Sequence, residues 1–205
     1  MAFVVKYSHM KKIVWFLAFF FIIVALFYGS RFIYRANTGQ LVTNKGDVEI
    51  SNWREFVSPS GDFKVLFAVE PRHINSDYQN VKRDAYRITN KDISYAVLVA
   101  TYPFEKTSPF SLDKAKEMLE ANLEANLLPG QTISSKNITN FGDYPAMDYV
   151  TKTTVDGTQF VYERGKVILV DSEKDFTLYF LSALYKDNLD DKSYNTFVNS
   201  FKILK

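Results

Sequence analysis

Cysteine and histidine carry much of the nucleophilic and metal-binding chemistry of proteins, and this sequence has little of either. It contains no cysteine and two histidines in 205 residues. His9 precedes a long apolar stretch, so a serine triad or a histidine metal site in the rest of the chain has to use His73. No Gly-x-Ser-x-Gly elbow accompanies it. We interpret His73 as a solvated residue of a polar loop, and we expect no catalytic residue, no metal site and no cofactor.

An acidic run at 187–191, Asp-Asn-Leu-Asp-Asp, raises the question of calcium binding. A calcium loop of the EF-hand type needs an oxygen donor at its third position and glycine at its sixth. Leu189 and Lys192 stand there instead. We therefore expect Asp190 or Asp191 to serve as the N-cap of a helix, because a short side-chain oxygen satisfies the first free amides of a helix.

A second charged run, Glu-Arg-Gly-Lys at 163–166, lacks the spacing of a phosphate-binding loop. It lies inside a segment that otherwise has the character of a β-hairpin strand. We predict that it forms a polar interruption or a bulge in that strand.

Three aromatic residues, Tyr102, Phe104 and Phe110, lie at the start of and within a proline-containing segment between a predicted strand and a predicted helix. If they are exposed, they form a candidate partner-binding patch, because aromatic residues are enriched at binding hot spots. If they pack beneath the helix, they belong to the hydrophobic core. The sequence is compatible with both interpretations, and we favour the core one.

The longest apolar stretch covers residues 13–30 and has no charged side chain. About 18 helical residues at 1.5 Å each nearly span a hydrocarbon core of ~30 Å. Its apolar residues surround the helix on all sides, unlike those of an amphipathic soluble helix. We predict a short tip at residues 1–12, a transmembrane helix at 13–30, a linker at 31–51 and one α+β domain at 52–205.

The charges beside this stretch are nearly symmetric, with Lys6, Lys11 and Lys12 before it and Arg31 and Arg35 after it. The short lysine-bearing tip resists translocation, whereas a long domain crosses largely regardless of its charge. We expect a single-pass protein of the inner (plasma) membrane, with its N-terminus in the cytoplasm and its domain outside.

A cleaved signal peptide is the alternative to an uncleaved signal-anchor. Signal peptides have an apolar core of about 7–15 residues and a small-x-small cleavage site. This apolar stretch is longer, and Phe27 and Tyr28 are bulky where small residues are needed. We favour the uncleaved anchor.

The remainder of the chain alternates between strand-like and helical patterns. Residues 63–69, 93–102, 146–155, 158–170 and 176–185 have the apolar patterning of strands. Residues 112–127 repeat leucine and alanine at spacings of three and four after Ser111, a suitable N-cap, and Pro129-Gly130 ends this pattern. Strands, one long helix, more strands and a terminal helix predict an antiparallel sheet with helices packed on it. A formal net charge of +2 gives no indication of nucleic-acid binding.

Three phrases resemble the PsbP-like superfamily. They are Phe-Val-Ser-Pro-Ser-Gly-Asp-Phe-Lys-Val-Leu-Phe at 56–67 with Glu70-Pro71 after it, Phe-Gly-Asp-Tyr-Pro-Ala-Met-Asp-Tyr at 141–149, and Phe-Val-Asn-Ser-Phe-Lys-Ile at 197–203. The resemblance implies a central antiparallel sheet sandwiched by helices. It also implies a non-enzymatic role in protein binding or assembly and carries over no catalytic residue.

Together, these observations predict a membrane-anchored periplasmic domain that binds a protein partner, as an accessory or assembly factor of an envelope or membrane complex. The alternative is a domain that binds lipid or a small hydrophobic ligand in a cleft between sheet and helix.

Overall fold

The computed structural model describes residues 52–76, 81–90, 93–103, 111–155, 159–172, 174–186 and 189–204, which belong to one compact unit. The predicted transmembrane helix and linker lie outside these ranges, as do Phe104 and Phe110. Among the described residues, neither helix combines the length and the hydropathy needed to cross a bilayer.

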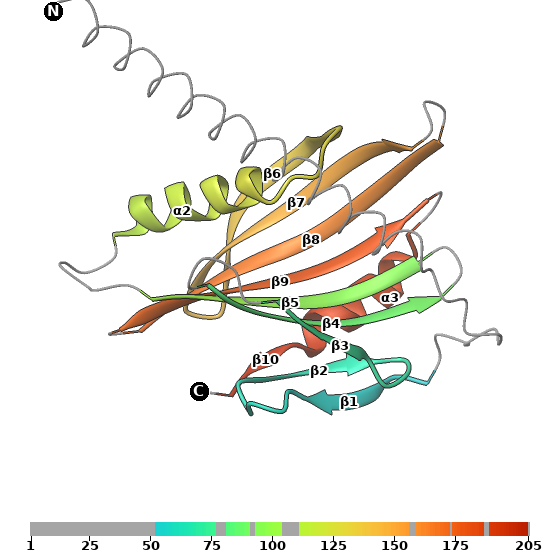
Figure 1. The fold of residues 1–205 in the computed structure, drawn as a ribbon, viewed down its shortest axis with the longest axis horizontal. Coiled ribbons are helices and arrows are strands. Elements are labelled where there is room, and N and C mark those ends of the chain that lie inside the picture. Colours follow the sequence, from blue (N-terminus) through green and yellow to red (C-terminus); the bar gives the residue numbers. More distant parts are fainter. Residues whose placement is uncertain are drawn as a thin grey trace, which may run out of the picture. The chain divides into compact units, whose positions relative to one another are not determined.

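Seven antiparallel strands form the large sheet, in the spatial order β3-β4-β5-β9-β8-β7-β6 (Figure 1). The antiparallel α+β architecture is confirmed. The strands are β3 (Arg72–Asn75), β4 (Lys82–Asn90), β5 (Ile93–Pro103), β6 (Gln131–Phe141), β7 (Tyr144–Val155), β8 (Gln159–Asp171) and β9 (Asp175–Tyr185).

A separate small sheet contains three strands, β1 (Arg54–Val57), β2 (Phe63–Phe67) and β10 (Lys202–Ile203), in the order β1-β2-β10. The sequence predicted one sheet, and this division was missed. The turn at 58–62 returns the chain from β1 to β2. The Ser58 side chain holds that turn, because its hydroxyl accepts a hydrogen bond from the Asp62 amide at 2.9 Å.

Two helices complete the described domain. Helix α2 (Leu112–Ala125) begins at the predicted cap, where the Ser111 hydroxyl accepts a hydrogen bond from the Lys114 amide. Helix α3 (Asp191–Ser200) begins at Asp190, whose carboxylate accepts from the amides of Lys192 and Ser193. The N-cap interpretation of the acidic run is therefore confirmed.

The large sheet has a different cover on each face. Helix α2 packs on β7 and β8, where Leu119, Met147 and Val167 are fully buried. The opposite face meets β2 and α3 through a core that contains Phe63, Phe67, Tyr95, Leu181 and Phe197. Since the apolar residues of β5 and β9 alternate between these two cores, the central strands are buried on both sides.

Two details of the local predictions were wrong. Residues 163–166 are a polar run within the hairpin strand β8, as predicted, but they pair with β7 and β9 in continuous register and form no bulge. The irregularity of the β6–β7 pair lies between Ile133 and Ser135. A small side chain is needed at Gly165, because a Cβ there would come within 2.4 Å of the Tyr149 ring. His73 lies on edge strand β3, not in a loop. Its polar neighbours are compatible with a strand because an edge strand remains in contact with water.

Candidate functional site

The one predicted partner-binding residue within the described ranges, Tyr102, lies near the end of β5. Its ring is half-buried and stacks on Phe176, with centroids 4.7 Å apart and an interplanar angle of 7°. It also packs against the core beneath α2. Tyr102 therefore contributes to the hydrophobic core, and its role in partner binding stays a prediction.

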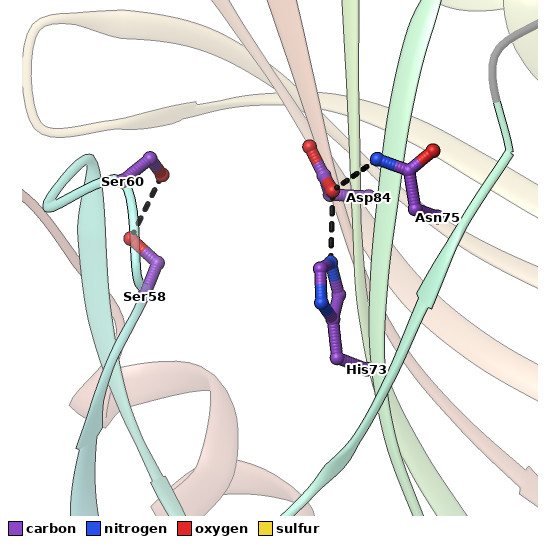
Figure 2. A network of polar contacts seen from close by, with 5 residues as sticks. All are labelled: Ser58, Ser60, His73, Asn75 and Asp84. Atoms are coloured by element: carbon purple, nitrogen blue, oxygen red, sulfur yellow. Dashed lines mark hydrogen bonds and ion pairs between the residues drawn. The ribbon is translucent and has the colours of Figure 1, made fainter.

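His73 lies in a polar cluster shown in Figure 2. Its Nε2 atom is 2.8 Å from Asp84 Oδ1, and the Asn75 side-chain amide donates to the same oxygen at 3.3 Å. The imidazole stacks on Tyr86 with centroids 4.7 Å apart. The His73 side chain is 45% exposed and that of Asp84 is 20% exposed. The predicted exposure of His73 is confirmed, although this side chain is held by three neighbours.

The serines drawn in the same view are part of the β1–β2 turn. Ser58 and Ser60 share a hydrogen bond at 3.3 Å, and Ser58 also accepts from backbone amides. Figure 2 shows this pair apart from the histidine, with no hydrogen bond drawn between them. Nucleophilic catalysis requires a nucleophile within hydrogen-bond reach of its base. Among the described residues, the His73 cluster has no such pair, and no group of three His, Cys, Asp or Glu residues is arranged to hold a metal ion.

A second polar cluster lies on the α2 face of the sheet, beyond the apolar contacts of the helix. The Tyr149 hydroxyl donates to Glu163 Oε1 at 2.9 Å, and the Gln131 amide donates to Glu163 Oε2 at 3.1 Å. Burial raises the pKa of Tyr149 well above its ordinary value, and the nearby Glu163 carboxylate raises it further. The phenol therefore stays protonated at neutral pH and holds the carboxylate. Both oxygens of Glu163 accept hydrogen bonds, so we interpret the cluster as structural.

Four residues form a stripe that we call the aromatic arm: Lys152, Phe160, Tyr162 and Tyr185. Phe160 is exposed, and the other three side chains are half-buried. The Lys152 ammonium lies 3.5 Å from the centroid of the Phe160 ring, and Phe160 is 42% exposed. Tyr162 stacks on Tyr185 with centroids 5.6 Å apart. Phe160 and Tyr162 are two residues apart in β8 and therefore lie on the same face of the sheet, the face opposite α2.

The aromatic arm continues into a charged pair beside α3. Arg164 is the next residue along the same face of β8, and it forms an ion pair with Asp191. Its guanidinium carbon lies 4.3 Å from the centroid of the Tyr194 ring. Figure 1 shows the β7–β8 hairpin projecting beyond α2, with α3 on the other side of the sheet. An apolar stripe with a cationic margin has the composition typical of a protein-binding surface.

The sequence analysis did not single out the aromatic arm. The sequence does place Phe160 and Tyr162 two residues apart, shortly after the Asp156-Gly157 pair that is typical of a β-hairpin turn. This spacing predicts a common face, but the stacking on Tyr185 depends on the pairing of β8 with β9. Aromatic residues that are close in the sequence can be recognised without a structure, whereas cross-strand partners such as Tyr162 and Tyr185 cannot.

No family model matches the chain, and no curated protein sequence matches it. Solved structures do show weak similarity. LpqN of Mycobacterium tuberculosis, a protein involved in cell envelope biogenesis, is 16% identical over 76% of this chain and 80% of its own, with a TM-score of 0.39. The Ran-binding protein Mog1p of Saccharomyces cerevisiae is 12% identical over 75% and 96%, with a TM-score of 0.44.

Cyanobacterial PsbP (CyanoP) of Synechocystis sp. PCC 6803 shows 12% identity over 77% of this chain and 96% of its own, with a TM-score of 0.42. Similarities of this size transfer neither a function nor a residue role. The described part of the chain is a mostly β-sheet α+β fold with two helices.

Proposed function

We propose that this chain is a single-pass, membrane-anchored, non-enzymatic domain of the PsbP-like superfamily. It binds a protein partner on the extracytoplasmic side of the inner membrane, as an accessory of an envelope or membrane complex. The observation that carries the binding role is the aromatic arm. The anchor rests on the uncharged stretch at residues 13–30.

The aromatic arm suits a protein partner for two reasons. Tyr162 and Tyr185 are already ordered by cross-strand stacking, and the Phe160 ring lies against the Lys152 ammonium, so less side-chain entropy remains to be lost on binding. The Lys152 ammonium above Phe160 adds a charge that a partner carboxylate can meet. Binding would cover this charge and the exposed ring together.

The non-enzymatic character is supported by the way polar groups are used. Asp84 holds His73, and Tyr149 and Gln131 hold Glu163, so the described histidine and the Glu163 carboxylate have structural partners. Ser58 stabilises a turn. No described residue combines an activated nucleophile with a base, which acyl transfer of the triad type requires.

Photocrosslinking tests the binding role. A benzophenone amino acid replaces Phe160 in the full chain, and Leu112, a 56% exposed residue of α2, carries the same probe as the matched control. We expect a discrete crosslinked protein from position 160 and none from position 112. The same product from both positions, or no product from position 160, contradicts the proposal.

Protease treatment of sealed, inside-out and right-side-out vesicles tests the topology separately. We expect the domain to be cleaved when the extracytoplasmic side is exposed and protected when the cytoplasmic side is exposed. The reverse pattern contradicts the orientation, and recovery of a trimmed chain without membrane contradicts the anchor.

A further inference from the structure

The uncovered part of the large sheet carries an arginine cluster at one edge, formed by Arg72, Arg83 and Arg87. Arg72 and Arg87 are direct cross-strand partners in the β3–β4 pair. Arg83 lies four residues before Arg87 on the same strand and therefore on the same face. Within the described part of the chain, none of the three forms an ion pair.

The strand register assigns this cluster to the α2 face. Arg87 pairs with Ala96 of β5, and Leu98, two residues further along β5, packs against the core beneath α2. Helix α2 packs on β7 and β8, at the other end of the sheet. The residues around Arg87 on this face are half-buried, whereas Tyr86 and Ile88 on the opposite face are buried. No described element covers the arginine cluster.

Like charges directly opposite each other destabilise a strand pair. The Arg72–Arg87 pair is therefore repulsive; the Glu163 carboxylate offsets part of this repulsion, and an anion bound at Arg72 would offset more of it. Arg87 is also partly fixed, because its Nε atom donates to Ser94 Oγ at 2.8 Å. Burial lowers the pKa of Arg87, while Glu163 raises it, and a guanidinium remains charged at neutral pH in either case. Arginine recognises carboxylates with two parallel hydrogen bonds.

Strand β3 is an edge strand of the large sheet, and β4 is its only partner among the described strands. The Ser76 amide donates to the Arg83 carbonyl at 3.0 Å. Hydrogen-bonded and non-hydrogen-bonded pairs alternate in an antiparallel ladder, so the amides and carbonyls of His73 and Asn75 point away from β4. These groups form an open edge that can pair with a further strand.

We propose that this edge binds an extended, acidic protein segment as an additional strand along β3. Acidic side chains at alternate positions of that segment would lie against Arg72 and Arg83, whereas Arg87 is held on the β5 side by Ser94. The open backbone groups favour an extended peptide over a free anion or a lipid headgroup, because neither of these would use a row of amides and carbonyls. This surface is distinct from the aromatic arm, and the inference does not depend on the membrane anchor.

The test uses the full chain and a short, fluorescently labelled peptide with glutamate at every second position and threonine between. Fluorescence anisotropy measures its affinity. We expect Arg72→Gln and Arg83→Gln each to weaken binding about tenfold, since a hydrogen bond to a charged group contributes at that level. Arg54→Gln removes the same charge from an exposed residue of the small sheet and should change nothing.

Two further peptides separate strand addition from simple charge attraction. A peptide of equal composition with its glutamates in one block should bind at least several-fold more weakly. A peptide methylated at alternate amides should lose binding, and hydrogen exchange should show protection of the His73 and Asn75 amides by the unmodified peptide. Equal binding of the blocked peptide, or no protection at these amides, overturns the proposal.

Vesicles containing phosphatidylglycerol test whether the arginine cluster binds a lipid headgroup instead. Arginine-dependent vesicle binding without peptide binding would assign the cluster to a lipid headgroup and overturn the proposal. Phe160→Ala should leave peptide affinity unchanged, so failure of this inference and failure of the aromatic-arm proposal give different results. Circular dichroism confirms that each variant is folded.

Discussion

The α2 face of the large sheet has two regions that differ in what covers them. At β7 and β8, the helix buries Leu119, Met147 and Val167 completely. At β3 and β4, the same face carries Arg72 and Arg87 with no described helix over them. The covered region stabilises the fold, and we propose that the uncovered region serves recognition.

Leu119→Ala should give the largest effect. This side chain is fully buried between α2 and the sheet, so its truncation leaves a cavity. We expect a loss of about 2–5 kcal/mol in the free energy of unfolding, measured with urea. Leu112→Ala, on the exposed side of the same helix, should change it by less than about 0.5 kcal/mol. Equal effects would contradict the assigned helix face.

Gly165→Ala tests the packing within the covered region. The added Cβ would lie within 2.4 Å of the Tyr149 ring, which is buried and bonded to Glu163. We expect a loss of about 1–3 kcal/mol, typical of overpacking. In a Tyr149→Leu background the same substitution should cost less, because the two sites are in contact. Additive costs would contradict the contact.

Buried tyrosines should control stability at alkaline pH, and Tyr179 is one of them on the face opposite α2. Burial, followed by the influence of Asp62, raises the pKa of Tyr179 from 10.0 to about 12. The folded state therefore keeps a proton that the unfolded state loses. The resulting stability is complete below pH 10 and is lost as the pH rises toward 12. Tyr179→Phe should make the decline of unfolding free energy above pH 10 less steep in urea titrations. An unchanged slope would be inconsistent with a buried, neutral phenol.

Arg72→Glu should change the free energy of unfolding least, and it should raise this free energy where Leu119→Ala and Gly165→Ala lower it. It replaces a repulsive cross-strand pair with an attractive one, and Arg72 is exposed. We expect a gain of about 0.2–1 kcal/mol in the free energy of unfolding, reduced by added salt. Arg54→Glu on the small sheet is the matched charge change. A loss of stability in Arg72→Glu would show that this arginine supports the fold.

Local sequence patterns predicted most of the elements. The leucine spacing after Ser111 predicted helix α2. The preference for a short side chain with an oxygen acceptor before a helix predicted Asp190 as the N-cap of α3. The division into two sheets could not be predicted in this way, because the pairing of β2 with β10 joins segments more than a hundred residues apart. The sequence gives no local signal for such pairing.

The candidate surfaces were less predictable than the fold. The aromatic arm depends on the pairing of β8 with β9, and the arginine cluster depends on the register of β3 against β4. His73 was assigned to a loop because its neighbours are polar, but an edge strand has a polar environment too. The aromatic prediction concentrated on residues adjacent in sequence, and Tyr102 packs on Phe176 of a neighbouring strand.

The most direct test of the proposed function is purification of the full chain at its native abundance in mild detergent. The wild type is compared with a Lys152→Ala, Phe160→Ala double variant by native mass spectrometry. We predict that the wild-type chain is recovered with a stoichiometric second protein, and that the variant stays folded and loses it. Recovery of the wild-type chain alone, or of the same complex from both proteins, would contradict a binding domain that acts through the aromatic arm.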